Sequence, residues 1–248
     1  MVYETENIVY DGWLSAMFRK DVYEFVLDDE FIKSVNQESG VEHKKILNLQ
    51  SQSVFLYSKV FTTYFLGIYF LEELHFNLVD TNVTFDKPVI SKNNLVGNCH
   101  IRFAVPEDQK SIIDLARKSF VYTRFHLDPE FPDKTADNIK GEWFRNYFEG
   151  NRGDRMIVAL IDKKIVGILQ LFYGNDKTLI IDQIAVDEKH RRMGIARDMI
   201  SFVETQCHGF VKIRVGTQLA NMPSVNLYED LGFKITDAKH VFHYHNQT

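Results

Sequence analysis

The segment from Ile184 to Ile200 has the residue types and the spacing of an anion-binding site. An apolar strand ending in Ile-Ala-Val-Asp leads into a short basic loop, and a helix begins at Gly194. The first N–H groups of a helix lack intrahelical acceptors and carry a partial positive charge, so together they bind phosphate. Gly194 and Ala196 are small enough to let a bulky anion approach the backbone. Four side chains add positive charge there: Lys189, Arg191, Arg192 and Arg197. The alternative is an ordinary strand-to-helix turn with a solvated basic loop.

A second segment, Asn221 to Phe233, contains another motif, and the two motifs together are more informative than either one alone. Its Tyr228 stands seven residues after Asn221 and directly before Glu-Asp-Leu-Gly-Phe. Together with Arg-x-x-Gly-x-Ala at residues 191–196, this pattern resembles the GCN5-related N-acetyltransferase (GNAT) superfamily. On its own, Tyr228 would be read as an aromatic residue on an amphipathic helix.

The resemblance implies that acetyl-CoA is the co-substrate and that no metal is needed. It implies that Asn221 contacts the pantetheine arm and that backbone N–H groups of the strand Gln183 to Val186 polarise the thioester carbonyl. The residues expected to contact acetyl-CoA are Ile184, Ala185, Val186, Arg191, Arg192, Met193, Gly194, Ile195, Ala196, Arg197, Asn221 and Ser224.

Tyr228 is the expected catalytic residue, because the resemblance places its hydroxyl near the thioester sulfur. A neutral amine attacks the thioester, and collapse of the tetrahedral intermediate expels a thiolate. A phenol within hydrogen-bond reach can protonate that sulfur. The base stays open: a water relay to Asp182, to Gln183 or to a residue of the segment 122–150 would serve.

The acceptor is expected to meet the segment Phe120 to Pro132, which combines a cation, a histidine, a carboxylate and aromatic rings around two prolines. A polar loop satisfied by its own contacts is the alternative. The run Arg-Phe-His-x-Asp-Pro resembles the bacterial dTDP-fucosamine (dTDP-4-amino-4,6-dideoxygalactose) N-acetyltransferases, and so do Asp137, Trp143, Asn146 and Gly150 after it. The expected acceptor contacts are Arg124, His126, Asp128 and Gln183.

This resemblance favours acetylation of the 4-amino group of a dTDP-linked amino sugar. Two alternatives stay open. The acceptor could be another small-molecule or peptide amine, or the chain could be a CoA-binding module that has lost catalysis.

The composition narrows the class of protein. The chain has 248 residues, a net charge of −5 and two cysteines, Cys99 and Cys207, so no zinc or disulfide framework and no nucleic-acid partner is expected. The longest apolar run, Tyr64 to Leu71, is too short to span a membrane. The N-terminus lacks the pattern of a signal peptide, so we expect a cytoplasmic protein.

Periodicity predicts an α/β fold with a mixed (α+β) sheet and helices on both faces, not a doubly wound parallel sheet. After a linker at residues 87–97, the expected order is strand, helix, helix, three antiparallel strands, helix, strand, helix and strand. The strands are expected at 100–104, 156–160, 165–173, 179–186, 211–215 and near 241–244. The first helix is expected to start at 105–108 and to carry Ile112, Ile113, Leu115 and Ala116, and the second, within 122–150, to carry Ile139, Trp143 and Tyr147. The last two helices are expected from 194 to about 207 and around 225–231.

A faint internal repeat predicts how the chain is divided. Residues 54–80 align without gaps on residues 211–237, pairing for example Val54 with Val211 and Phe76 with Phe233. We therefore expect a degenerate, smaller GNAT-like domain at 1–97 and a catalytic GNAT domain at 98–248. In the first copy Leu71 replaces Tyr228, His75 replaces Gly232, and no Arg-x-x-Gly-x-Ala loop precedes them. Its expected roles are packing, shaping the acceptor pocket or homodimerisation. Chance likeness of two amphipathic units is the alternative.

Overall fold

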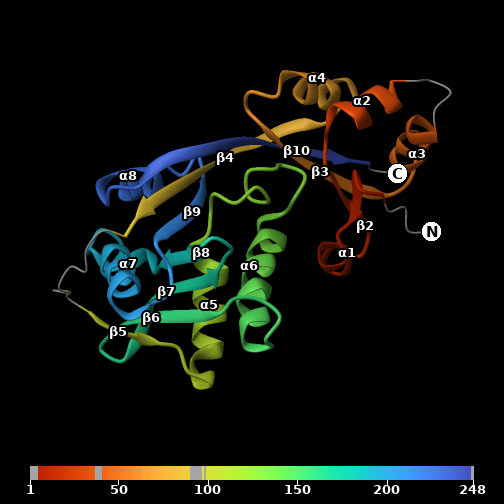
Figure 1. Cartoon of the computed structure of the whole chain (residues 1–248). Helices are drawn as coiled ribbons and strands as arrows, with labels where there is room; N and C mark the ends of the chain where they lie inside the picture. Colours follow the sequence, from red (N-terminus) through yellow and green to blue (C-terminus); the bar gives the residue numbers. More distant parts are fainter. Residues whose placement is uncertain (1–4, 37–40, 90–96, 98, 247–248) are drawn as a thin grey trace. The chain divides into compact units, whose positions relative to one another are not determined.

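The computed structural model describes residues 5–36, 41–89, 97 and 99–246. It divides into two compact units (Figure 1). The first unit comprises Met1–Asn82 and Asp237–Thr248, and the second comprises Val83–Thr236. No helix within the described ranges has both the length and the apolar character that crossing a membrane requires.

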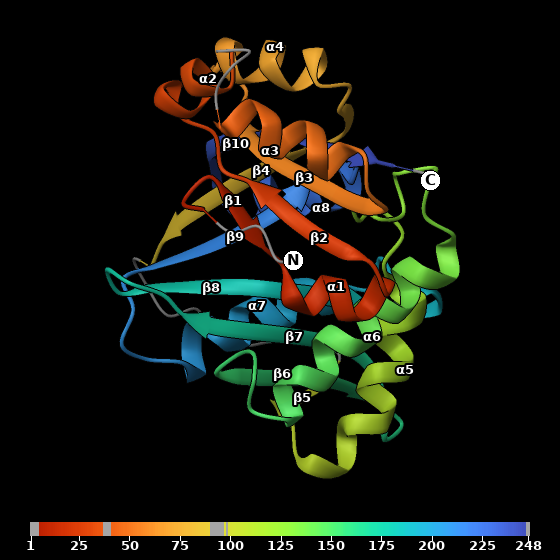
Figure 2. The same cartoon turned by 90° about the vertical axis from the view of Figure 1, so that its right-hand side faces the viewer.

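The first unit contains a small sheet with the strand order β1-β2-β3-β10. Strand β2 pairs with β1 antiparallel and with β3 parallel, and residues 239–245 of β10 pair antiparallel with β3. Figure 2 shows β1, β2 and β3 next to one another. The elements are β1 Ile8–Tyr10, α1 Gly12–Phe18, β2 Asp21–Phe25, α2 Asp29–Val35, α3 Val41–Gln50, β3 Val54–Phe61, α4 Phe65–Glu73 and β4 Asn77–Pro88.

The second unit contains a sheet with the order β4-β9-β8-β7-β6-β5. Its strands β5 to β8 are antiparallel neighbours, and β8 pairs with β9 in parallel. The elements are β5 His100–Phe103, the 3₁₀ turn η1 Pro106–Asp108, α5 Gln109–Ser119, α6 Asp133–Phe148, β6 Arg155–Ile161, β7 Lys164–Tyr173, β8 Thr178–Val186, the 3₁₀ turn η2 Glu188–His190, α7 Ile195–Gln206, β9 Lys212–Gln218 and α8 Met222–Asp230. Strand β10, Lys234–His245, begins in this unit and belongs to the first unit from Asp237 onward.

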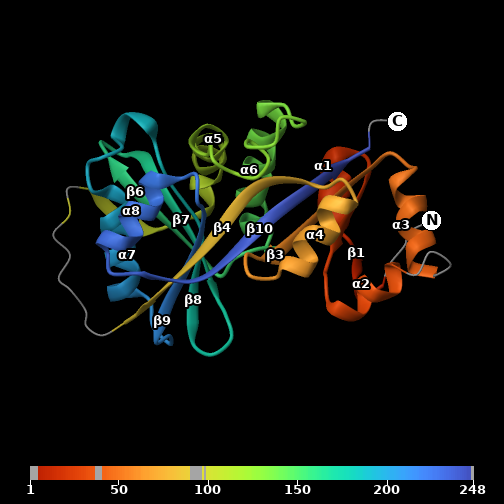
Figure 3. The ribbon, with the colours of Figure 1, turned by 90° about the horizontal axis from the view of Figure 1, so that it is seen from above.

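Helices cover both faces of this second sheet because side chains alternate along its strands. On β6, Met156 and Val158 pack in one buried cluster with Ile112 and Leu115 of α5. Gly167 of β7 faces the other way, where an added Cβ would lie 3.0 Å from the side chain of Met199 and 3.1 Å from that of Ile195, both on α7. Helix α6 packs beside α5 (Figure 1, Figure 3). The predicted mixed sheet with helices on both faces is therefore present.

The last part of β4 is fixed to β9 by ion pairs within the second unit. Asp86 accepts hydrogen bonds from Arg214 at 2.7 and 2.8 Å and from Lys212 at 3.1 Å. The Arg214 hydrogen bond, with that from Lys212, holds the pKa of the Asp86 carboxyl below its ordinary value.

The boundaries between the two units lie at residues 82 and 236, whereas we expected one boundary at residue 97. Periodicity does not reveal that β4 enters the second unit.

Three differences from the expected elements have a physical cause. Strand β4 continues to Pro88, inside the expected linker, while residues 90–96 of that linker lie outside the described residues. Strand β10 begins at Lys234, whereas we expected it near Val241. Its first part was not predicted because residues 234–240 are exposed or half-buried and so lack apolar alternation. Helix α8 begins at Met222, three residues before the expected start. The prediction began at Val225 because that is the first buried residue of the helix.

The sequence repeat is also a repeat of local structure. The alignment places α4 on α8, both of nine residues, and the first residue of β4 on the first residue of β10. After each helix, a left-handed residue makes the turn: His75 with φ 62° in the first copy and Gly232 with φ 84° in the second. In each copy the next N–H donates to the carbonyl five residues earlier, at 2.9 Å from Phe76 and 3.0 Å from Phe233. Two unrelated amphipathic segments would not be expected to share these details.

Candidate functional site

The N-terminus of α7 offers backbone donors to solvent. Gly194 caps the helix with φ 83°, a left-handed conformation that favours glycine, and no side chain caps the helix start. The first helical hydrogen bond runs from Asp198 N–H to Gly194 O at 3.0 Å, so the N–H groups of residues 195–197 precede the helical ladder. Among the described residues, no atom lies within 4 Å of a Cβ added at Gly194. No described residue thus blocks the approach to the predicted anion site at this point.

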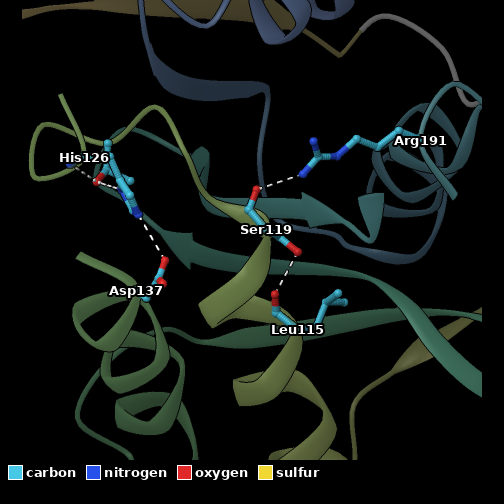
Figure 4. A network of polar contacts seen from close by, with 6 residues as sticks. Leu115, Ser119, His126, Asp137 and Arg191 are labelled. Atoms are coloured by element: carbon cyan, nitrogen blue, oxygen red, sulfur yellow. Dashed lines mark hydrogen bonds and ion pairs between the residues drawn. The ribbon is translucent and has the colours of Figure 1, made fainter. Parts of the chain in front are cut away.

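Arg191 fixes the position of this loop. Its guanidinium donates to Ser119 O at 3.1 Å, at the end of α5, and to Val186 O at 3.3 Å (Figure 4). A cation at the carboxyl end of a helix is favourable because the free carbonyls there carry partial negative charge. By contrast, Arg192 and Arg197 have no hydrogen-bond or ion-pair partner among the residues that the structure describes. The side chain of Lys189 likewise has no such partner among these residues, so three of the four cations are left for an anionic ligand. Met193 is exposed between Arg192 and Arg197.

Strands β8 and β9 separate just before this loop. Their pairing ends at Ile181 and Val215, although β8 continues to Val186 and β9 to Gln218. The separation coincides with a register shift against β7, where Gln170 faces Gln183 while Leu171 faces Ile181, so Asp182 is an extra residue. The edge of residues 183–186 toward β9 therefore keeps N–H and C=O groups that no β9 residue pairs. Ile184, Ala185 and Val186, all predicted ligand residues, lie on it.

Tyr228 lies on α8 between two phenylalanine rings. Its ring centroid is 5.6 Å from that of Phe85 and 5.7 Å from that of Phe233, and the residue is 2% exposed. This burial raises the pKa of the phenol above its ordinary value, so the hydroxyl keeps its proton at neutral pH. The acid role expected for Tyr228 would use this retained proton, and that role stays a prediction.

Asn221 has a structural use that the sequence analysis did not include. It is the N-cap of α8: its side-chain oxygen accepts from Ser224 N–H at 3.4 Å, and its amide donates to Thr217 Oγ1 at 3.3 Å. Both Asn221 and Ser224 thus hold the start of the helix that carries Tyr228, beside the end of β9.

The segment after α5 is held by local polar contacts. His126 lies between Thr123, with Nδ1 2.6 Å from Oγ1, and Asp137, with Nε2 3.2 Å from Oδ1 (Figure 4). Asp128 is 2% exposed and accepts from Glu130 N–H at 3.0 Å, and the guanidinium of Arg124 lies 4.6 Å from the centroid of the Phe125 ring. These contacts fit the alternative reading of a satisfied polar loop for His126 and Asp128.

The structure brings Gln183 together with a buried lysine that the sequence analysis missed. Lys140 Nζ donates to Gln183 Oε1 at 2.8 Å and lies 4.0 Å from the ring centroid of Trp143. Burial lowers the pKa of Lys140 to about 7. A signal was present: in a helix, Lys140 shares a face with Ala136 and Phe144, four residues away on either side, and both are buried.

Asp182, one of the groups considered for a water relay, is paired. Arg152 donates to both of its carboxylate oxygens, at 3.0 and 2.7 Å. The guanidinium thus occupies both carboxylate oxygens. A water relay to Asp182 would have to displace one of these two hydrogen bonds.

Comparisons with known proteins identify a family for part of the chain. Residues 111–233, which lie within the second unit, match the model of the Acetyltransferase (GNAT) family. A spore coat polysaccharide biosynthesis protein, SpsD, of Bacillus subtilis is 35% identical over 142 residues, which cover 56% of this chain and 48% of the relative. The chain spans about half the length of the curated relatives it matches.

Two solved structures are similar over most of the chain. A functionally unknown conserved protein from Staphylococcus epidermidis has a TM-score of 0.67 at 15% identity, covering 99% of this chain and 94% of that one. A GCN5-related N-acetyltransferase from Sphaerobacter thermophilus has a TM-score of 0.63 at 12% identity, covering 91% and 72%. At these identities the likeness shows the fold, and the predicted fold class is confirmed.

Proposed function

Because residues 111–233 belong to the GNAT family of acetyltransferases, we propose that the second unit transfers an acetyl group from acetyl-CoA to a primary amine. One observation carries the proposal. The unpaired edge of β8 at residues 183–186 leads directly into the uncapped N-terminus of α7. An extended chain with amide groups, ending in a pyrophosphate, is complementary to that succession of backbone donors and acceptors.

Acetyl-CoA would bind along these two elements. Its pyrophosphate takes the N–H groups at Gly194 to Arg197, with Arg192 and Arg197 supplying charge and Arg191 holding the loop in place. Its pantetheine arm follows the free edge of β8, and a backbone N–H of residues 183–186 donates to the thioester carbonyl. Asn221 and Ser224 hold the start of α8 beside this path.

The chemistry is a direct attack. The neutral amine adds to the thioester carbonyl, the C–N bond forms, and the oxyanion is stabilised by the β8 backbone donor. The intermediate then collapses with cleavage of the C–S bond, and the Tyr228 hydroxyl gives its proton to the leaving sulfur. No metal ion takes part in this scheme.

The first unit, in this proposal, is a degenerate copy of the second without an acetyl-CoA site of its own. The matching helices α4 and α8 and the matching turns at His75 and Gly232 support a common origin. Leu71, which takes the position of Tyr228, has no proton to give. One transfer site per chain follows.

We propose as acceptor a dTDP-linked 4-amino-4,6-dideoxygalactose, attacked through its 4-amino group. The resemblance of the run at residues 124–129 suggests it, and the match to a relative named for polysaccharide biosynthesis supports a sugar. Arg124 supplies a cation for the nucleotide phosphates, whereas the contacts of His126 and Asp128 give these two a role in fixing the loop.

The test of this acceptor compares initial rates for the dTDP-linked amino sugar, the free amino sugar and a polyamine. We expect kcat/KM for the dTDP-linked sugar to exceed that of the free sugar by about 100-fold or more, since the nucleotide adds binding energy that the free sugar lacks. Equal values for the linked and free sugars, or turnover of the polyamine alone, would contradict the acceptor while leaving acetyl transfer intact.

A further inference from the structure

Lys140 is a charged residue type in an apolar position. It is 5% exposed and lies on the buried face of α6, with the rings of Trp143 and Phe120 centred 4.0 and 4.6 Å from Nζ. Within the described part of the chain, Gln183 Oε1 is the single hydrogen-bond acceptor of this nitrogen. An ammonium group has three N–H donors, so among the described residues the other two have no oxygen or nitrogen acceptor and meet only the faces of these two rings. A buried donor in that situation points to a ligand or to a neutral amine.

The charges that act on Lys140 do not compensate its burial. Asp182 on β8 favours the charged form, but Arg152 after α6 and Arg124 before it oppose that form. Arg152 also holds the Asp182 carboxylate. Desolvation is the largest influence and brings the pKa of Lys140 to about 7. At neutral pH, Lys140 is therefore a neutral amine with a lone pair in a large fraction of the molecules.

The hydrogen bond to Gln183 places Lys140 beside the proposed path of the thioester. Gln183 follows the extra residue Asp182 and lies on the β8 edge that has no partner in β9. The carbonyl that accepts the amine is expected at that edge. An acceptor amine approaching the thioester thus comes near the group that holds Gln183.

Acetyl transfer requires a proton acceptor, because a primary amine near neutral pH carries a proton that blocks its lone pair. Asp182 is held by Arg152, and each ring nitrogen of His126 already has a partner in Thr123 or Asp137. On the basis of the function proposed above, we propose that Lys140 is the general base of the reaction, taking a proton directly from the ammonium group of the acceptor.

The proton balance is complete with the groups named. The acceptor ammonium gives one proton to the neutral Nζ of Lys140, and its freed lone pair forms the C–N bond. When the C–S bond breaks, Tyr228 gives its proton to sulfur, and the second N–H proton of the attacking nitrogen restores the phenol. Lys140 then releases its proton to solvent. The products are the amide, the CoA thiol and one proton.

The kinetic test uses two substitutions of Lys140 and one control. Lys140→Met removes the amine, and Lys140→Arg keeps the positive charge and the donor to Gln183 but cannot accept a proton. The control is Lys134→Met, on the same helix at an exposed position. With acetyl-CoA and the dTDP-linked amino sugar at pH 7, both Lys140 variants are expected to lose about 100- to 1000-fold in kcat, and the control to lose nothing.

The pH profile separates a base from a residue that only positions Gln183. The wild-type kcat is expected to fall below pH of about 7 as Lys140 becomes protonated, and both Lys140 variants are expected to lose this inflection. If Lys140 merely held Gln183, Lys140→Arg would retain most of the activity and the inflection would persist in it. That result would overturn the proposal.

A measurement without turnover guards against a folding defect. In protein labelled with ¹³C at lysine Cε, one NMR resonance should titrate with a midpoint near pH 7, vanish in Lys140→Met and remain in Lys134→Met. A Lys140 resonance that titrates near pH of about 10, as an ordinary lysine does, would overturn the assignment. Absence of amine-dependent turnover by the wild type would overturn acetyl transfer itself, whereas wild-type turnover with an unaffected Lys140→Met would overturn only the role of Lys140.

Discussion

Tyr228→Phe is expected to lower kcat by about 100- to 1000-fold while leaving the affinity for acetyl-CoA unchanged. The substitution removes only the proton that would be given to the leaving sulfur. The aromatic ring remains between Phe85 and Phe233, so the packing of α8 is kept. We therefore expect a melting temperature within about 2 °C of that of the wild type.

The measurement is steady-state thiol release, with acetyl-CoA affinity taken from isothermal titration. A matched control is Tyr244→Phe, which removes the hydroxyl of a half-buried tyrosine in the first unit. Its kcat should not change. Full activity of Tyr228→Phe at every pH tested would remove the assignment of Tyr228 as the acid, and a loss confined to affinity would assign it to binding instead.

Gly194→Glu is expected to weaken acetyl-CoA binding by about 100-fold. The new carboxylate would stand where the pyrophosphate meets the N-terminus of α7, and like charges at contact distance repel by several kcal/mol under partial screening. The left-handed backbone at φ 83° adds strain for any side chain, roughly 1–2 kcal/mol.

Gly209→Glu controls for that strain. Gly209 has φ 88°, lies just beyond the carboxyl end of the same helix, and an added Cβ there also meets nothing within 4 Å. Both variants should lose similar stability in urea unfolding, yet only Gly194→Glu should bind acetyl-CoA more weakly. Equal affinities in the two variants would show that the anion does not bind at the start of α7.

Much of the second unit could be predicted because its elements carry strong periodicity. The three antiparallel strands β6 to β8 and the helix starting at Gly194 follow from apolar alternation and from one glycine before an amphipathic run. Strand β10 was predicted much too short, since its first half is exposed or half-buried. The internal repeat was visible in the sequence as weak similarity. The agreement of its helix ends and turns, residue by residue, is visible only in the structure.

The candidate site was less predictable because its chemistry depends on contacts between distant segments. Arg191 was expected to bind the anion, yet it donates to Ser119 O, 72 residues away in sequence. Asn221 was expected to contact pantetheine, and its cap of α8 is local geometry that the resemblance did not imply. Lys140 was missed because a lysine in a helix is ordinarily solvated; its position on the face of Ala136 and Phe144 was a weak signal, and the packing of Phe120 and Trp143 against it shows the burial directly.

The measurement that tests the central claim most directly is amine-dependent thiol release by the purified wild-type chain. Acetyl-CoA is mixed with the dTDP-linked amino sugar and with a panel of other primary amines, while thiol and amide are quantified together. The account predicts that at least one amine yields thiol and acetylated product in equal amounts, with little thiol in its absence. Tight binding of acetyl-CoA without turnover of any amine would contradict it and would identify the chain as a CoA-binding module.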